Sequence, residues 1–216
     1  MPDLSFHVES VSVVPCAAAP TLAFKLNITN AAVGEAIDAI TLRCQIQLEV
    51  ARRRYTSEEQ ERLADLFGTP NRWSQTLRSM LWTNAYMVVP AFAGKTTSAE
   101  LQIPCTFDFN VAATKYFEGL SEGSIPLLML FSGTVFYSPT DGVLQVAPIS
   151  WEQEAAFKLP LTVWREMMDA YYPNCAWLNL RRDVFDRLYR YKMERGIPSW
   201  EQVLEEILPM EAAVKS

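Results

Sequence analysis

Residues 40–50 read Ile-Thr-Leu-Arg-Cys-Gln-Ile-Gln-Leu-Glu-Val, so apolar and polar side chains alternate at every position. This period of two is typical of a β-strand that buries one face. A strand of this kind needs a second layer of structure to cover its apolar side. The stretch therefore predicts a layered sheet protein, whose other strands and helices come from the remainder of the chain.

Two strands are predicted before this stretch. The apolar positions near the N-terminus change phase around Glu9-Ser10, which predicts a strand interrupted by a β-bulge. Residues 22–28 alternate like residues 40–50, and residues 30–35 have the composition of a turn. Together these segments predict that 22–28 and 40–50 form a strand pair.

Residues 101–111 repeat the alternation and predict a principal strand of the opposite sheet. Pro104 within it indicates an edge or a bulge, because proline has no N–H to donate to a sheet. We expect one core between the two sheets. It contains Leu42, Cys44 and Ile46 from the first strand and Cys105, Phe107 and Phe109 from the second.

Two more strands, at 127–137 and 143–149, flank the dipeptide Asp141-Gly142. Asp-Gly between apolar runs is a strong hairpin signal, so these strands are predicted to pair. Residues 77–89 are apolar in both phases. That pattern predicts a strand that is buried on both faces or lies against a subunit or a helix.

Helical signals appear in two regions. Thr56 and Glu59 have the spacing of a capping box and Gly68 that of a helix stop, which predicts one short helix between them. From residue 160 onwards the apolar period is that of helices. The predicted C-terminal helices cover residues 161–171, 182–195 and 199–208.

These elements predict an α+β protein that is mainly an antiparallel β-sandwich, Ig-like or C2-like, with a C-terminal helical extension. A chain of 216 residues is long enough for one such domain with a sizeable core. The expected domains are a sandwich over residues 1–159, with one inserted short helix, and a helical extension over residues 160–216 that packs on it.

The composition disfavours several classes of function. A net charge of −6 argues against nucleic-acid binding, which normally needs a positive surface. The longest apolar run, residues 125–131, is far shorter than the ~20 residues of a membrane helix. The N-terminus lacks the basic and apolar regions of a secretory signal. We therefore expect a cytoplasmic protein that binds no nucleic acid and does not insert directly into a membrane.

Few residues could carry chemistry. His7 is the only histidine, so a catalytic triad or a histidine-rich metal site would depend on that one side chain. The cysteines, Cys16, Cys44, Cys105 and Cys175, lack the spacing of metal ligands and are expected to be reduced structural thiols. The sequence contains no glycine-rich phosphate loop. It thus predicts no catalytic residue, no cofactor and no bound metal.

The densest group of aromatic and basic residues lies near the C-terminus. Aromatic and arginine side chains are enriched where proteins bind one another. The candidate partner-binding residues are Tyr171, Tyr172, Trp177, Arg181, Arg187 and Arg190. In the alternative interpretation, the aromatic side chains dock the helices on the sandwich and the charges are solvated.

One long stretch resembles a known family. It reads Trp177-Leu178-Asn179-Leu180-Arg181-Arg182-Asp183-Val184-Phe185-Asp186-Arg187-Leu188 and continues through Tyr191-Lys192 to Gly196-Ile197-Pro198-Ser199-Trp200-Glu201. It is similar to a family of uncharacterised bacterial proteins whose genes often lie beside actinobacterial-type NiFe-hydrogenase genes. The resemblance extends to residues 22–50 and so to most of the chain. It implies a gene context, and no catalytic residues come with it.

We therefore expect a protein without enzymatic activity that binds another protein, as an accessory or assembly factor of a hydrogenase system. The partner would be a hydrogenase subunit or a second copy of the chain. Two alternatives are a β-sandwich that binds carbohydrate or lipid and an enzyme of unrecognised type. A cleft lined with converging carboxylates would favour the enzyme, whereas a flat aromatic patch would favour the protein-binding role.

Overall fold

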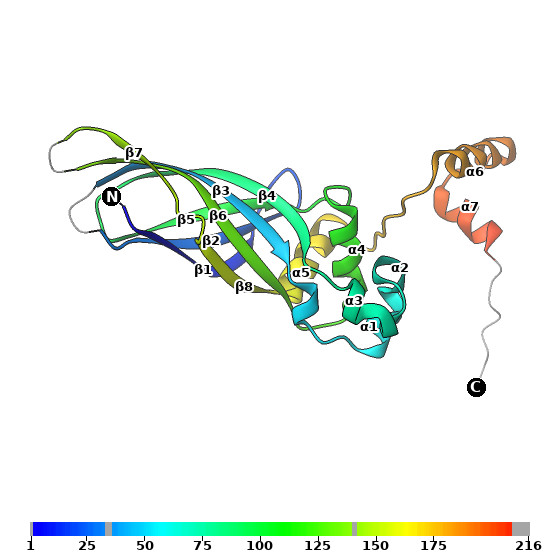
Figure 1. Ribbon diagram of the computed structural model, residues 1–216. Helices are drawn as coiled ribbons and strands as arrows, with labels where there is room; N and C mark the ends of the chain where they lie inside the picture. The colour runs from blue at the N-terminus through cyan, green and yellow to red at the C-terminus, as the bar shows by residue number, and fades with distance from the viewer. Residues whose placement is uncertain (1, 33–35, 140–141, 209–216) are drawn as a thin grey trace. The chain divides into compact units, whose positions relative to one another are not determined.

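Two antiparallel sheets pack face to face in the computed structural model, which describes residues 2–32, 36–139 and 142–208 (Figure 1). One sheet has the order β1-β2-β5 and the other the order β4-β3-β6-β7, with β8 also paired to β6. The strands are β1 Leu4–Val13, β2 Thr21–Asn30, β3 Ala36–Leu48, β4 Met80–Phe92, β5 Thr96–Pro104, β6 Ser124–Ser138, β7 Gln145–Pro148 and β8 Glu154–Pro160. The predicted antiparallel β-sandwich is confirmed.

The strand β3 lies inside its sheet, between β4 and β6. Its residue Cys44 is paired with Ala85 on one side and Phe131 on the other. The apolar positions of the alternating stretch are buried, as predicted. Aromatic rings then join the two sheets across the core: Phe6 stacks on Phe131 with ring centroids 4.5 Å apart. Such pairs add to the stability gained by burial alone.

The predicted bulge in the first strand is also present. The pairing of β1 with β2 slips between Val8 and Ser10, so Glu9 is the extra residue. Val8 is buried before the slip, and Val11 and Val13 pack against the core after it. The bulge therefore moves the apolar positions of β1 from one phase to the other while keeping them on the same side.

The predicted pairing of residues 22–28 with residues 40–50 is wrong. β2 is hydrogen-bonded to β1 and β5, whereas β3 is hydrogen-bonded to β4 and β6. The connection between them therefore passes from one sheet to the other. Of the predicted turn, residues 33–35 lie outside the described residues.

The predicted strand over residues 101–111 is wrong in its second half. β5 ends at Pro104, and helix α4, Val111–Gly119, begins soon afterwards. Asn110 begins this helix by accepting a hydrogen bond from the N–H of Ala113. As a consequence Phe109 is 41% exposed, so it does not join the inter-sheet core. Of the three side chains expected there, Cys105 is buried and Phe107 is half-buried.

The predicted hairpin is confirmed by the pairing of Tyr137 in β6 with Gln145 in β7. Asp141, which predicted the turn, lies outside the described residues. The sequence analysis missed β8, which pairs with the first half of β6. Its signal was an alternation of Ala155, Phe157 and Leu159 with polar or small neighbours, directly before the helical pattern.

The predicted strand over residues 77–89, which is apolar in both phases, corresponds to β4. Trp82, Ala85 and Val89 are buried, whereas Tyr86 is 70% exposed and Val88 is 64% exposed. The outer face of this strand is therefore apolar without being covered in the described chain.

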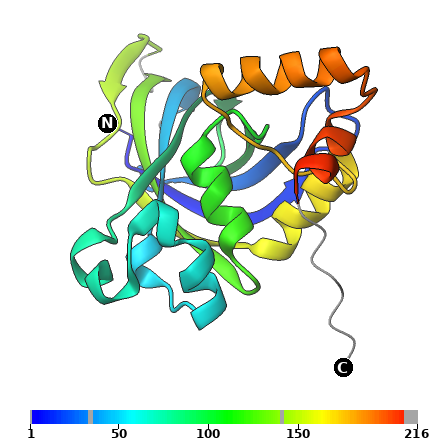
Figure 2. The ribbon, with the colours of Figure 1, turned by 90° about the vertical axis from the view of Figure 1, so that its right-hand side faces the viewer.

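Several short helices gather at one end of the sandwich, where one inserted helix was expected (Figures 1 and 2). The capping box of Thr56 and Glu59 and the stop at Gly68, with φ 77°, are both present. Aromatic contacts join these helices to one another and to α4, for example between Phe67 and Tyr116. The other elements of this cap are the 3-10 helices η1 Val50–Arg52 and η2 Pro70–Arg72 and the helices α1 Ser57–Arg62, α2 Ala64–Phe67 and α3 Trp73–Thr76.

Helix α5, Leu161–Tyr171, begins and ends as predicted but belongs to the sandwich. Trp164 packs against Phe117 of α4 with ring centroids 5.3 Å apart, and Met167 is fully buried. Because α5 completes this core, the two compact units are Met1–Asn174 and Cys175–Ser216, and the predicted boundary after residue 159 is corrected. The second unit contains α6, Arg182–Arg195, and α7, Trp200–Ile207.

Over the described residues, no helix combines the length and apolar character that crossing a membrane requires.

Candidate functional site

The C-terminal unit has an aromatic cluster, formed by Phe185 and Tyr189 of α6 and Trp200 of α7. The ring of Trp200 lies 5.4 Å from that of Phe185 and 6.3 Å from that of Tyr189. The ammonium group of Lys192 lies 5.8 Å from the Trp200 ring, within the range of a cation–π contact. These contacts hold the two helices together while the rings stay 36–49% exposed.

Polar contacts join the same two helices. The hydroxyl of Tyr191 donates to Glu206 at 3.1 Å, and Arg195 forms an ion pair with the same carboxylate. Ser199 is the N-cap residue of α7 and accepts a hydrogen bond from the N–H of Gln202, at the predicted start of this helix. Gly196, with φ 63°, ends α6.

The structure separates the predicted arginines from the aromatic cluster. Arg187 and Arg190 are exposed. At 3.6 residues per turn, Arg187 lies on the side of α6 opposite Phe185 and Tyr189, and Arg190 lies about 120° around the helix from the middle of that aromatic side. Arg190 donates to the backbone carbonyl of Asp186 at 3.4 Å. The two kinds of side chain therefore form two faces of one helix.

Two further predicted residues precede α6. Arg181 is its N-cap residue and pairs with Asp183 at 3.1 Å. Trp177 lies in the segment before it and is 36% exposed. Both thus remain candidates for contact with a partner.

Tyr171 and Tyr172 have structural roles in the sandwich unit. The hydroxyl of Tyr171 donates to the carbonyl of Ala17 at 2.8 Å. The ring of Tyr172 packs against Phe107 at 4.7 Å. For these two residues the alternative interpretation, in which aromatic side chains dock a helix, describes the structure better.

A second apolar surface lies on the outer face of β4 and β3. Arg43 lies over the ring of Tyr86 at 5.8 Å and donates to Asn84 at 3.1 Å. Beside them is a hollow of about 400 Å³ that also includes Val88 and Gly133. Gly133 lets β6 approach β3 closely, since a Cβ at this position would lie 2.0 Å from the carbonyl oxygen of Thr41.

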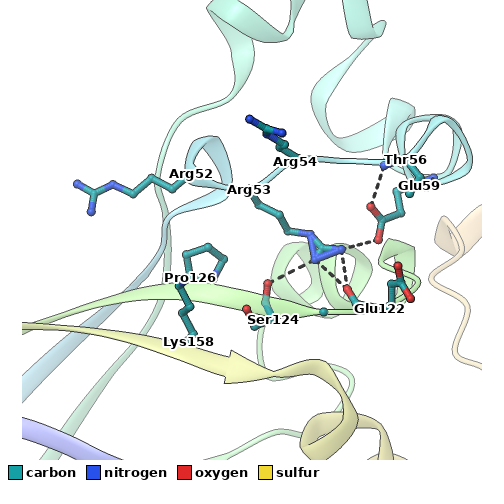
Figure 3. A pocket seen from close by; sticks show the side chains of 10 residues that line it. Arg52, Arg53, Arg54, Thr56, Glu59, Glu122, Ser124, Pro126 and Lys158 are labelled. Carbon is teal, nitrogen blue, oxygen red and sulfur yellow. Dashed lines mark hydrogen bonds and ion pairs between the residues drawn. The ribbon is translucent and has the colours of Figure 1, made fainter.

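The sequence analysis missed a polar site centred on Arg53, shown in Figure 3. Arg53 follows β3, and its guanidinium donates to Glu59 at 2.5 Å and to the carbonyl of Glu122 at 2.7 and 3.0 Å. A longer contact, 3.4 Å, reaches the carbonyl of Ser124. The possible signal was the run of three arginines, 52–54, placed just before a capping box whose glutamate bears the opposite charge.

Glu59 is the anion of this site, and its side chain is 1% exposed. Burial works to raise its pKa, but hydrogen bonds from the N–H groups of Ser121 and Thr56 and the charge of Arg53 outweigh burial and hold the pKa below its usual value. The carboxylate is therefore ionised at neutral pH. It joins α1 to the segment before β6.

A second arginine binds the same segment from α5. Arg165 donates to the carbonyls of Leu120 and Ser121 at 2.5 and 2.7 Å. These carbonyls follow α4, where a cation complements the negative end of the helix dipole. Arg53, Glu59 and Arg165 together hold the connection from α4 to β6.

The buried thiols are poor nucleophiles. Burial raises the pKa of Cys44 and of Cys105 to about 12, so both are protonated at neutral pH. Cys105 donates to the carbonyl of Ile103 at 3.4 Å. Across residues 2–32, 36–139 and 142–208, no three His, Cys, Asp or Glu side chains gather as metal ligands would.

The profile of a protein family described as "Family of unknown function (DUF6084)" matches residues 1–216. The chain belongs to this family. A comparison with curated proteins returned no match. The DUF6084 assignment covers both compact units, so the sandwich and the C-terminal helices are parts of one family architecture.

Solved structures share only distant similarity with this DUF6084 chain. The ApaA protein from Bordetella pertussis is 16% identical, with a TM-score of 0.30, over 74% of this chain and 94% of that one. The CARDB domain of a Pyrococcus furiosus protein, solved with di-metal ions, is 11% identical, with a TM-score of 0.28, over 74% and 92%. A late embryogenesis abundant protein is 13% identical, with a TM-score of 0.31, over 74% and 73%.

Proposed function

We propose that this protein is a non-enzymatic, protein-binding accessory factor and that its C-terminal unit carries the docking surface. The main support is the apolar character of that unit: among its described residues, Val203 alone is buried. The exposed large apolar side chains are Trp177, Leu178, Leu180, Phe185, Tyr189, Met193, Trp200, Leu204, Ile207 and Leu208.

A two-helix unit of this length buries too little apolar surface to be stable without further contacts. Rigid aromatic side chains are also the residues that contribute most to protein–protein affinity. A partner that covers the aromatic cluster would both complete its core and gain these anchors. The charged face with Arg187 and Arg190 would then lie at the rim, where charges influence association rate more than affinity.

The resemblance of residues 177–201 supports a NiFe-hydrogenase subunit as the first partner to test, and a cytoplasmic location goes with this proposal. The experiment measures binding of the purified full-length chain to purified hydrogenase subunits. The variant Tyr189→Ser/Leu204→Ser removes two exposed apolar side chains. Its matched control, Leu81→Ser/Val88→Ser, removes two from β4, where Leu81 is 50% and Val88 64% exposed.

We expect Tyr189→Ser/Leu204→Ser to weaken binding by ~2 kcal/mol or more, because anchors of this type have effects of that size. The β4 control should bind like the wild type. Light scattering tests the second copy as partner: a dimer that the C-terminal variant dissociates would identify it. A monomer that binds no hydrogenase subunit would contradict the proposal.

A further inference from the structure

The hollow beside Arg53 has a donor that no protein group uses. The side chain of Arg53 is 10% exposed, and its Nη1 and Nη2 donate to Glu59 and to two carbonyls. Its Nε–H is buried and has no acceptor in the described chain. A buried arginine donor without a protein acceptor indicates a place for a water molecule or an anionic ligand.

Positive charge around this hollow exceeds negative charge: it is lined by four cations, Arg52, Arg53, Arg54 and Lys158, and by two carboxylates, Glu59 and Glu122. Glu59 is paired with Arg53, and Glu49 is paired with Arg52 at 3.0 Å. Arg54 and Lys158 also line the hollow, and within the described residues the side chain of neither has an ion-pair or hydrogen-bond partner. An oxyanion between them would relieve the repulsion of these cations in a chain whose net charge is −6.

Figure 3 shows how the charged side chains are arranged. Arg53 extends into the site, whereas Arg54 extends outward from it. The carboxylate of Glu122, which would repel an anion, is directed away from the Arg53 guanidinium. Exposed side chains such as Arg54 exchange rotamers within nanoseconds, so Arg54 can rotate toward a bound ligand.

The hollow has room for more than a single oxyanion group. Its volume is about 330 Å³, at the lower end of ligand pockets, which span ~300–1,000 Å³. A neighbouring hollow of about 470 Å³ shares Arg52, Pro126 and Lys158 with it. That second hollow is also lined by Leu127, by the partly buried Phe157 and by the only histidine, His7.

We propose that the two neighbouring hollows bind a small organic anion. Its phosphate or carboxylate group accepts hydrogen bonds from the Nε of Arg53 and from Arg54 and Lys158, while its apolar part lies against Phe157. The site lies in the sandwich unit and does not depend on the protein-binding role of the C-terminal unit.

The test is isothermal titration of the full-length protein with phenyl phosphate and, separately, with benzoate. The two anions distinguish a phosphate site from a carboxylate site, and benzyl alcohol is the neutral control. The variant Arg54→Gln/Lys158→Gln removes two exposed cations of the hollow and leaves Arg53 in place. Its matched control, Arg78→Gln/Lys95→Gln, removes the same charge at exposed positions outside both hollows.

We expect saturable binding of at least one anion that weakens as sodium chloride is raised, because the charges are partly screened. The Arg54→Gln/Lys158→Gln variant should bind it about tenfold more weakly or worse, since hydrogen bonds to charged groups are the strong ones. The charge-matched control should bind like the wild type. If neither anion binds saturably, or if the hollow variant and the control behave alike, the proposal is wrong and water occupies the Nε of Arg53.

Discussion

Nη2 of Arg53 lies 2.5 Å from Oε1 of Glu59, and the two side chains are 10% and 1% exposed. Glu59 also accepts hydrogen bonds from the N–H groups of Thr56 and Ser121. The carboxylate of Glu59 therefore binds donors from three places: the N-cap of α1, the residues that follow β3 and the segment after α4. The charge is buried only because all of these donors surround it.

Glu59→Gln should lower the free energy of unfolding by about 3–5 kcal/mol, because removal of one partner leaves the charge of Arg53 buried without its counter-ion. Urea unfolding followed by circular dichroism measures the change. The control is Lys115→Gln, which breaks an ion pair with Asp65 whose side chains are 49% and 60% exposed. That control should cost less than about 1 kcal/mol. Equal costs for the two variants would mean that the Arg53–Glu59 pair is no more important than a surface pair.

The same carboxylate should make stability depend on acid pH. Its pKa in the folded protein is lowered, whereas an unfolded glutamate titrates near about 4.3. The contribution of Glu59 to the free energy of unfolding is therefore fully present above about pH 4.3, and it is lost as the pH falls from there through the folded-state pKa. Unfolding free energies measured between pH 6 and pH 3 should fall less steeply for Glu59→Gln than for the wild type. If the unfolding free energies of the two proteins fell equally steeply with pH, the acid dependence could not be assigned to Glu59.

Gly133→Ala should destabilise the sandwich by about 3 kcal/mol or more, because φ at Gly133 is +144° and the new Cβ would meet backbone atoms of β3. Gly94→Ala is the control, since its φ is ordinary for an L-residue and its nearest contact would be 3.6 Å. That substitution should change the unfolding free energy by less than about 1 kcal/mol. Chemical denaturation of both variants checks this, and a stable Gly133→Ala protein would show that β6 can move away from β3.

Trp164→Ala should cost about 3–5 kcal/mol, because Trp164 is 5% exposed and packs on Phe117. Trp151→Ala is the matched control: this side chain is 87% exposed, and its loss should change stability by less than about 0.5 kcal/mol. Thermal unfolding of both variants compares them. A small effect at Trp164 would place α5 outside the sandwich core and restore the predicted boundary after residue 159.

Much of the fold could be predicted because local chemistry specifies it. The alternation of residues 40–50 fixed which face of β3 is buried, and the phase change at Glu9 located the bulge. Capping residues such as Thr56 and Gly68 act on the backbone of their own turn, so they identified helix ends correctly. The prediction that β5 continues to residue 111 was wrong. Cys105, Phe107 and Phe109 alternate with polar residues as in a strand, but Asn110 begins a helix directly after them.

For the candidate sites, too, local features could be predicted from the sequence and tertiary contacts could not. Exposed aromatic and basic residues near the C-terminus could be recognised from composition, but only the folded chain shows that the face of α6 with Phe185 and Tyr189 is the one that contacts Trp200 of α7. The role of Tyr171 and Tyr172 was hidden because their partners, Ala17 and Phe107, lie far away in the sequence.

The sequence by itself determined the class of most segments, the buried face of the main strands and the ends of the C-terminal helices, since these depend on side chains a few residues apart. Only the tertiary structure decided that β2 and β3 belong to different sheets and that Arg53 is buried beside Glu59. The alternation of side chains in a strand shows which face is apolar, but it does not specify which strands are hydrogen-bonded to it. Likewise, the burial of Arg53 depends on acceptors 69 and 71 residues away, at Glu122 and Ser124, which only the folded chain brings within reach.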